Sequence, residues 1–353
     1  MRCSACWLLL AAATLCFGVK AQSVEEPIPP KPTRGILWYY HIPKTGGTSV
    51  DHHIDDFLKR REGNRVRKVA LWAQMWNLPN VRGETPAETA HIKARMRMAR
   101  CQKALERIEA YVNSPPNPRE PLLIVHQHLS CGGMVQMAPI MRRFRAMIES
   151  QGGAMHVSCL LRQPIARLVS QLNYARELTP EQWERSLLSN PNMDNHQVRF
   201  LLYNWPTQYH DNRLLEPYYK FGANLVGATD ADEAAGDSIS MHYYPPLGGI
   251  TSEHVIAALE YLEDNFDYVG QTEQLGEYLG ELEAFASKFI DTSAWQFEET
   301  RSNVQGVNVR LDPKVAPQIH SWREAPPFLQ ELLITRTSFD AELHEEAMKL
   351  KLN

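Results

Sequence analysis

Short apolar runs recur along the chain and are separated by amphipathic segments. Gly35 to Ile42 (GILWYYHI) is apolar and aromatic and is bounded by a glycine and a proline, which is typical of a buried strand. Leu122 to Val125, Met155 to Leu161 and Phe266 to Gly270 have the same character. These four runs predict buried strands.

Helical patterns follow three of these runs. A helix is expected from near Thr48, and Pro164 begins a second one, with apolar residues at helical spacing at Ile165, Leu168, Val169 and Leu172. The amphipathic stretch from Glu273 to Phe289 predicts a third helix, and Lys59 to Lys103 is helical in composition. Strands that alternate with helices predict an α/β fold, a P-loop-like three-layer domain in which helices flank a mainly parallel sheet.

The first 34 residues differ in pattern from the rest. Residues 1–21 run from Arg2 through an apolar stretch of about 14 residues, Cys6 to Val19, to a small-residue end, which predicts a secretory signal peptide. An uncleaved signal anchor is the alternative, although a membrane span needs roughly 20 apolar residues. Residues 22–34 are rich in proline and predict a linker. Residues 35–353 are therefore expected to form one domain in the secretory pathway.

Composition and charge narrow the classes of partner. Of the 353 residues, 44% are hydrophobic and 22% are charged, as in ordinary globular proteins. The formal net charge of -4 gives no overall attraction to nucleic acid, so we expect no nucleic-acid partner, and any anion site must be built locally. Two basic clusters, within residues 59–68 and 93–103, favour a solvated helix face, with a docking surface for an acidic polymer as the alternative.

Three cysteines lie outside the targeting segment, Cys101, Cys131 and Cys159. They permit one disulfide and one free thiol, and the pairing is left open. Cys159 lies in an apolar run, which favours buried packing. None of the three belongs to a C-x-x-C pair, so no zinc site is expected.

The segment between the first strand and the first helix carries candidate chemistry. Residues 41–49 read HIPKTGGTS. Gly46 and Gly47 let the backbone approach an anion closely, the helix N-terminus offers free N–H groups, and Lys44 adds a full charge. Hydroxyl groups that complete the cradle come from Thr45, Thr48 and Ser49. The lysine precedes the glycines, which argues against a Walker A motif and an NTPase.

This loop resembles the 5′-phosphosulfate loop of sulfotransferases that use the donor PAPS, most closely the Golgi enzymes that sulfate heparan sulfate at the 6-O or 2-O position. Three later segments are similar to family motifs in the family's order. Residues 160–170 (LLRQPIARLVS) resemble the 3′-phosphate motif, 195–201 (NHQVRFL) an N-x-Q-x-R-x-L segment, and 266–273 (FDYVGQTE) a late F-x-x-V-G-x-T-E segment. Gln163 departs from the acidic residue that is usual before the proline. The resemblance covers roughly Gly35 to Asn308.

The resemblance implies a donor site for PAPS, released as PAP, in the Golgi lumen or outside the cell. The loop residues would hold the 5′ side, with Lys44 neutralising charge on the leaving phosphate. Arg162 and Ser170 take the positions that hold the 3′-phosphate, and Arg301 is a further candidate in a loop over the nucleotide. The implied acceptor-side residues are Asn195, Gln197 and Arg199. No metal is expected.

Transfer to a hydroxyl also needs a base. His126 and His128 lie at the end of a predicted strand, whose alternation puts both imidazoles on one face, and similar enzymes carry a catalytic histidine here. A neutral imidazole suits proton removal near neutral pH. We expect His126 to be the base, with His128 as the alternative, and two packed core histidines as the non-catalytic interpretation. His41 is expected to support the loop, and Asp51 to point away from the donor.

The predicted function is therefore in-line transfer of a sulfuryl group from PAPS to a hydroxyl acceptor, a carbohydrate by resemblance. A tyrosyl or small-molecule acceptor is one alternative. A secreted nucleotide- or glycan-binding protein without catalysis is another. A membrane contact is expected only if the N-terminal segment is an uncleaved anchor.

Overall fold

The computed structural model describes residues 32–59, 65–71, 86–128, 134–174, 179–202, 247–293, 295, 319, 321–350 and 352. The predicted signal peptide and most of the predicted linker lie outside these residues, and so do Cys131 and Arg301. Pro32 to Asn353 form one compact unit. Within the described ranges, no helix has both the length and the apolar character that crossing a membrane requires.

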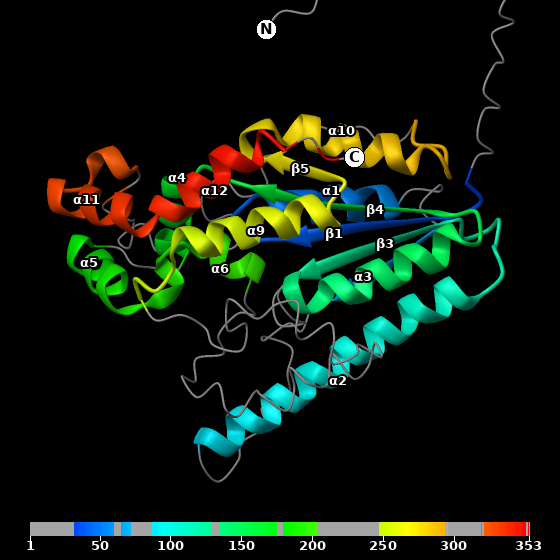
Figure 1. Ribbon diagram of the computed structural model, residues 1–353, viewed down its shortest axis with the longest axis horizontal. Helices are drawn as coiled ribbons and strands as arrows, with labels where there is room; N and C mark the ends of the chain where they lie inside the picture. Colours follow the sequence, from blue (N-terminus) through cyan, green and yellow to red (C-terminus); the bar gives the residue numbers. More distant parts are fainter. Residues whose placement is uncertain are drawn as a thin grey trace, which may run out of the picture. The chain divides into compact units, whose positions relative to one another are not determined.

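The described core is built on a parallel sheet of five strands in the order β2-β3-β1-β4-β5, of which Figure 1 labels β3, β1, β4 and β5. The strands are β1 (Gly35–His41), β2 (Val66–Leu71), β3 (Leu122–His128), β4 (Ala154–Leu161) and β5 (Tyr268–Gln271). The predicted α/β fold is confirmed. His41 lies beside His128 and Leu161 beside Gln271 in the register, so four carboxyl ends share one edge.

β2 corrects one expectation, because Lys59 to Lys103 is not helical throughout. Val66–Leu71 forms an edge strand, and its charged residues pair with neighbouring elements. Arg67 contacts Glu120 at 3.1 Å, and Lys68 contacts acidic groups of the helix that follows β1. Charged side chains are common on edge strands, where they oppose pairing with other chains. Because of these charged residues, the composition of the segment favoured a helix over a strand.

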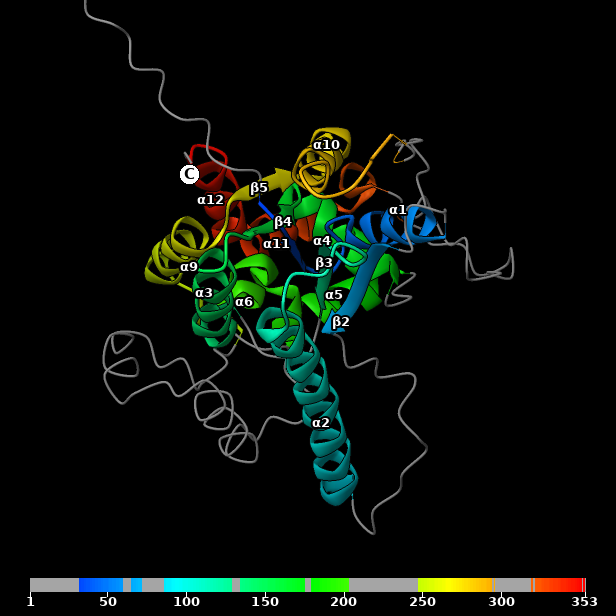
Figure 2. The ribbon, with the colours of Figure 1, turned by 90° about the vertical axis from the view of Figure 1, so that its right-hand side faces the viewer.

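Helices cover both faces of the sheet (Figure 2). Alternation along β1 sends Leu37 and Tyr39 to a core with α1 (Gly47–Leu58) and α10 (Leu275–Ala286). Ile36, Trp38 and Tyr40 face a second core. That core includes residues of α2 (Pro86–Asn113), α3 (Met134–Glu149), α6 (His196–Leu202), α9 (Ser252–Asn265) and α12 (Ser338–Ala347).

A third apolar cluster joins the helices beyond β4. It contains residues of α4 (Pro164–Tyr174), α5 (Pro180–Ser189) and α11 (Pro327–Arg336). The described residues also form three short 3₁₀ turns, η3 (Pro191–Met193), η5 (Thr272–Gln274) and η7 (Trp322–Glu324). The predicted helices at Pro164 and after residue 273 are therefore confirmed, the latter as η5 followed by α10.

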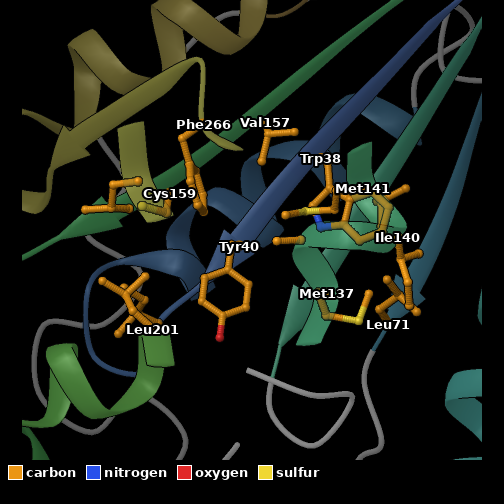
Figure 3. Packing of buried hydrophobic residues seen from close by; sticks show 14 of the residues in the cluster. Trp38, Tyr40, Leu71, Met137, Ile140, Met141, Val157, Cys159, Leu201 and Phe266 are labelled. Atoms are coloured by element: carbon orange, nitrogen blue, oxygen red, sulfur yellow. The ribbon is translucent and has the colours of Figure 1, made fainter. Parts of the chain in front are cut away.

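Figure 3 shows how Trp38 and Tyr40 pack among the apolar side chains of the second core, where their polar atoms also find partners. The Trp38 indole donates to the Gln127 side chain at 2.9 Å, and the Tyr40 hydroxyl donates to the Phe200 carbonyl at 2.8 Å. Cys159 is buried in this core, as predicted, and is a free thiol, whereas Cys101 on α2 is disulfide-bonded. The second core therefore contains hydrogen bonds between buried polar groups in addition to its apolar contacts.

The packed unit begins before Gly35. Arg34 is buried, and its guanidinium donates to the carbonyl oxygens of Tyr111, Val112 and Ser114 at the end of α2, at 2.6 to 2.9 Å. These carbonyls have no partner within the helix, so a cation there stabilises the helix end. Arg34 thereby fixes the position of the chain where β1 begins.

Candidate active site

The β1–α1 loop, residues Ile42 to Gly46, needs two left-handed residues. Lys44 has φ 70° and Gly46 has φ 88°. Glycine adopts this conformation freely, whereas a lysine carries strain of roughly 1–2 kcal/mol. The Thr45 hydroxyl donates to the Ile42 carbonyl at 2.8 Å, so this predicted ligand stabilises the turn. Strained backbone of this kind is concentrated at functional sites.

Gly47 begins α1, one residue before the predicted start, and packs against the His41 ring. A Cβ atom at this position would lie 2.0–2.4 Å from three atoms of that ring. Glycine is therefore required for the helix N-terminus to reach the end of β1. His41 supports the loop, as its position at the end of the strand predicts. Thr48 and Ser49 lie partly buried in the first turn of α1.

Three cationic side chains converge on the loop. The Arg162 guanidinium donates to the Lys44 carbonyl at 3.0 Å, and the buried Arg167 donates to the Pro43 carbonyl at 3.4 Å. Burial, followed by the charges of Arg167 and Arg162, lowers the pKa of Lys44 to about 8. The Lys44 ammonium lies 3.2 Å from the ring centroid of Tyr174, which is 61% exposed. Positive charge concentrated at a helix N-terminus favours an anion. Arg167 belongs to the quoted motif, but sequence reasoning gave it no role.

The late 266–273 segment joins the loop to the β4–α4 turn. The Thr272 hydroxyl lies within hydrogen-bond distance of two carbonyl oxygens, that of Thr45 at 2.6 Å and that of Leu161 at 3.1 Å. Glu273 accepts a hydrogen bond from the Gln163 amide at 3.2 Å. Thr272 and Glu273 therefore connect the β1–α1 loop with the β4–α4 turn, the two motifs that were predicted to contact opposite ends of a nucleotide.

The backbone of Arg162 is held from the side by Gln197. The Gln197 amide accepts a hydrogen bond from the Arg162 N–H and donates one to the Arg162 carbonyl, both at 2.9 Å. This two-point contact fixes the residue that follows β4. Ser170 lies partly exposed on α4, further along the same helix that carries Arg167. Gln197 is thus a support for a candidate anion ligand.

Asn195, Gln197 and Arg199 lie in the interior, 3% exposed or less. Asn195 accepts hydrogen bonds from two amides at the start of α12, and Arg199 forms an ion pair of 2.5 Å with the buried Asp194. Asp194 also accepts from the Gly248 amide. These partners give the segment a structural role. Direct contact with an acceptor stays a prediction that this burial does not favour.

Three histidines meet where β1 and β3 end. His41 Nδ1 lies 3.2 Å from His126 Nε2, and His128 Nδ1 lies 3.0 Å from the His41 carbonyl oxygen. The rings of His41 and His128 stack with centroids 3.9 Å apart. Burial lowers the pKa of each ring, and the neighbouring histidines add to the effect at His41 and His128. All three rings are therefore neutral near pH 7.

Asp51 on α1 is a site residue that sequence reasoning did not predict. Its Oδ1 lies 2.7 Å from His126 Nδ1, 2.9 Å from the Tyr39 hydroxyl and 2.6 Å from the Lys68 ammonium. Burial favours the protonated acid, but His126 and Lys68 outweigh it and hold the pKa of Asp51 well below its usual range. Asp51 faces His126, itself a candidate site residue, and its orientation away from the donor stays a prediction.

The helices that follow β1 and β3 leave for opposite faces of the sheet, because α1 packs in one core and α3 in the other. In open α/β sheets, ligands bind at the carboxyl edge where connections diverge in this way. A cavity of about 300 Å³, lined in part by Arg34, Tyr111 and Glu120, lies near the opposite ends of these strands. It is therefore separate from the loop and the histidines.

Among the described residues, no group of three or more histidine, cysteine or acidic side chains is arranged to hold a metal ion. Comparison of the chain with protein-family models and with curated proteins found no match. The resemblance to sulfotransferases therefore rests on the four quoted segments.

Proposed function

We propose that the chain is a PAPS-dependent sulfotransferase that places a sulfuryl group on a hydroxyl. The observation that carries the proposal is the juxtaposition of a cationic loop and neutral histidines. Lys44, Arg162 and Arg167 converge on the β1–α1 loop, and His41 connects that loop to His126 and His128. Cations for an anionic donor and a proton acceptor for a hydroxyl are the two requirements of this chemistry.

The residues present fit an anionic nucleotide. The lowered pKa of Lys44 reflects burial and two guanidinium neighbours, a local excess of positive charge that a phosphate or sulfate group would relieve. Gly46 and Gly47 keep the backbone of the loop and helix N-terminus open to close approach. When bound, PAPS supplies an activated sulfuryl group joined to a phosphate leaving group.

Different residues of the chain would contact different parts of the donor. Lys44 offsets the negative charge that develops on the leaving phosphate, and the first N–H groups of α1 assist it. Arg162 and Ser170 are the candidates for the 3′-phosphate, to which a guanidinium donates in a fixed fork. Thr272 and Glu273 keep these groups at a constant separation through their bonds to Thr45 and Gln163.

Partial exposure favours His128 as the base over His126, the base expected from the sequence. His126 is 2% exposed and uses Nδ1 with Asp51 and Nε2 with His41. His128 is partly exposed, and its Nδ1 donates to a carbonyl, so Nε2 is the nitrogen that accepts a proton. An anionic donor near Lys44 would raise the pKa of these rings and strengthen them as bases.

A carbohydrate acceptor follows from the resemblance alone, and the neutral histidines suit any hydroxyl. The predicted signal segment, which lies outside the described residues, supports a site of action in the secretory pathway. We therefore propose a lumenal or secreted enzyme acting on glycans.

The first test is calorimetric titration of the purified chain with PAP. Lys44→Ala and Arg162→Ala should each weaken binding about 10- to 100-fold, because a hydrogen bond to a charged group contributes roughly 1.5–3 kcal/mol. Arg143→Ala is the matched control, since Arg143 forms an exposed ion pair with Glu109 on the α2–α3 surface. It should bind PAP as the wild type does.

Binding that falls in both variants and not in the control would support the donor site. Labelled PAPS with desulfated glycans, tyrosine peptides and small alcohols would then define the acceptor. A folded wild-type protein that binds no PAP would overturn the proposed function.

A further inference from the structure

The carboxylate of Asp51 is one end of a hydrogen-bonded chain that continues through His126 to His41 at the carboxyl edge of the sheet. Oδ1 receives three donors, from His126, Tyr39 and Lys68. The ring of Tyr39 also stacks on His126 with centroids 4.4 Å apart. His126 is therefore fixed in both position and orientation from α1, β1 and β2.

Elementary donor and acceptor rules assign the protons along this chain. An ionised carboxylate only accepts, so His126 carries its proton on Nδ1. In the neutral ring Nε2 then accepts, and the donor facing it is His41 Nδ1. His41 is left with an unprotonated Nε2, and this edge of the ring packs on Gly47 at the start of α1.

His128 receives the same assignment from a different group. Its Nδ1 faces the His41 main-chain carbonyl, which only accepts, so Nδ1 is protonated and Nε2 is not. The assignments of His126 and His41 thus depend on Asp51, whereas that of His128 depends on the backbone. Loss of Asp51 should therefore change the proton positions of His126 and His41 and leave that of His128 unchanged, whereas general damage to the fold would affect all three rings.

We propose that Asp51 is a positioning residue for the histidines at this edge. Through His126 it fixes His41 with the Nδ1 proton directed inward, and His41 in turn holds the stacked ring of His128. The claim that this arrangement assists proton transfer rests on the proposed function. The assignment of the protons to particular ring nitrogens is independent of that function. A buried carboxylate that orients a catalytic imidazole through its Nδ1–H is a known solution to the same physical problem.

The proton positions can be measured on the full chain by NMR with ¹⁵N-labelled histidine, because protonated and unprotonated ring nitrogens differ in shift and coupling. In the wild type we expect Nδ1–H at residues 41, 126 and 128. A wild-type spectrum in which His41 carries its proton on Nε2 would overturn the proposal, whatever the variants do.

Two replacements of Asp51 sharpen the test. Asp51→Leu removes the acceptor and should move the proton to Nε2 in both His126 and His41, while His128 stays unchanged. Asp51→Asn retains an oxygen acceptor and should keep all three assignments. Asp55→Leu is the matched control, because Asp55 lies on the same helix and contacts the same Lys68 at 2.5 Å, yet forms no hydrogen bond to these histidines. If His41 in folded Asp51→Leu keeps its wild-type proton, Asp51 does not act through His126.

Activity tests the second part of the proposal. Asp51→Leu should lower kcat for sulfuryl transfer about 100-fold, as expected for impaired general base catalysis, with PAP affinity unchanged. A shifted proton together with an unchanged kcat would overturn the positioning role. Absence of any transfer by the wild type would overturn the proposed function, and the NMR result would still decide where the protons lie.

Discussion

Thr272 links the two segments that carry the cationic cluster, so its hydroxyl offers a direct test of how that cluster is held together. Thr272→Val keeps the shape of the side chain and removes its oxygen. The Thr45 and Leu161 carbonyls then lose their contacts with this hydroxyl, at 2.6 and 3.1 Å. Thr272→Ser provides the opposite change, because it keeps the oxygen and removes the methyl group.

The size of the effect follows from these contacts. One internal hydrogen bond contributes roughly 0.5–1.5 kcal/mol, and leaving a buried carbonyl unsatisfied costs about 1–3 kcal/mol. Thr45 is fully buried, so we expect Thr272→Val to lower the free energy of unfolding by about 2 kcal/mol. The loss of one methyl group in the serine variant should cost about 0.8 kcal/mol. If the β1–α1 loop must be ordered to bind PAP, 2 kcal/mol sets an upper limit of about 30-fold on the loss of affinity.

Urea unfolding of the two variants measures the first quantity, and titration with PAP measures the second. The valine variant should be the less stable of the two and the weaker binder. A valine variant that unfolds at the same urea concentration as the wild type, or that is more stable than the serine variant, would refute the reasoning from the shared hydroxyl.

Two further predictions concern strain and pH. Lys44→Gly should be more stable in urea than Lys44→Ala by about 1 kcal/mol, because both lose the ammonium but only glycine relieves the left-handed backbone; equal stabilities would exclude the strain. Burial raises the pKa of Asp340 to about 6, against hydrogen bonds from the Val198 and Gln197 amides. Between about pH 4 and 6 the folded state keeps a proton that the unfolded state has lost, so this contribution to stability falls as pH rises, by about 3 kcal/mol. The difference in unfolding free energy between wild type and Asp340→Asn should show this slope, and a flat difference would contradict it.

Three of the four strands that were predicted from sequence are buried along almost their whole length. β1, β3 and β4 coincide with apolar runs because both sides of each face helices or neighbouring core. β5 lies at one edge of the sheet and only Gly270 of its residues is buried, but the apolar run that starts at Phe266 indicated it. β2 lies at the edge, and its Arg67 and Lys68 satisfy acidic groups on other elements, so its local pattern does not indicate a strand. Pairing partners distant in sequence decided its structure.

The local geometry of the candidate site was predictable where one segment supplies all the information, as at the β1–α1 loop and the β4–α4 turn. Asp51 was not, because its role depends on His126 and Lys68, which come from two other strands. Asn195 and Arg199 show the converse. The resemblance to a family segment implied a role beside the acceptor, but the partners of these residues are a helix N-terminus and a buried aspartate. Sequence spacing does not reveal whether a polar group faces solvent or a buried partner.

The strand order also affects biosynthesis. β1 lies between β3 and β4, yet more than a hundred residues separate its end from the start of β4. At translation rates of roughly 5–20 residues per second, β1 leaves the ribosome on the order of 10 s before its second neighbour is made. During that time the segment GILWYYHI is an unpaired, apolar, β-forming sequence, the type that aggregates. The strand that precedes Lys44 therefore stays without its second neighbour, and open to aggregation, while the chain is being made.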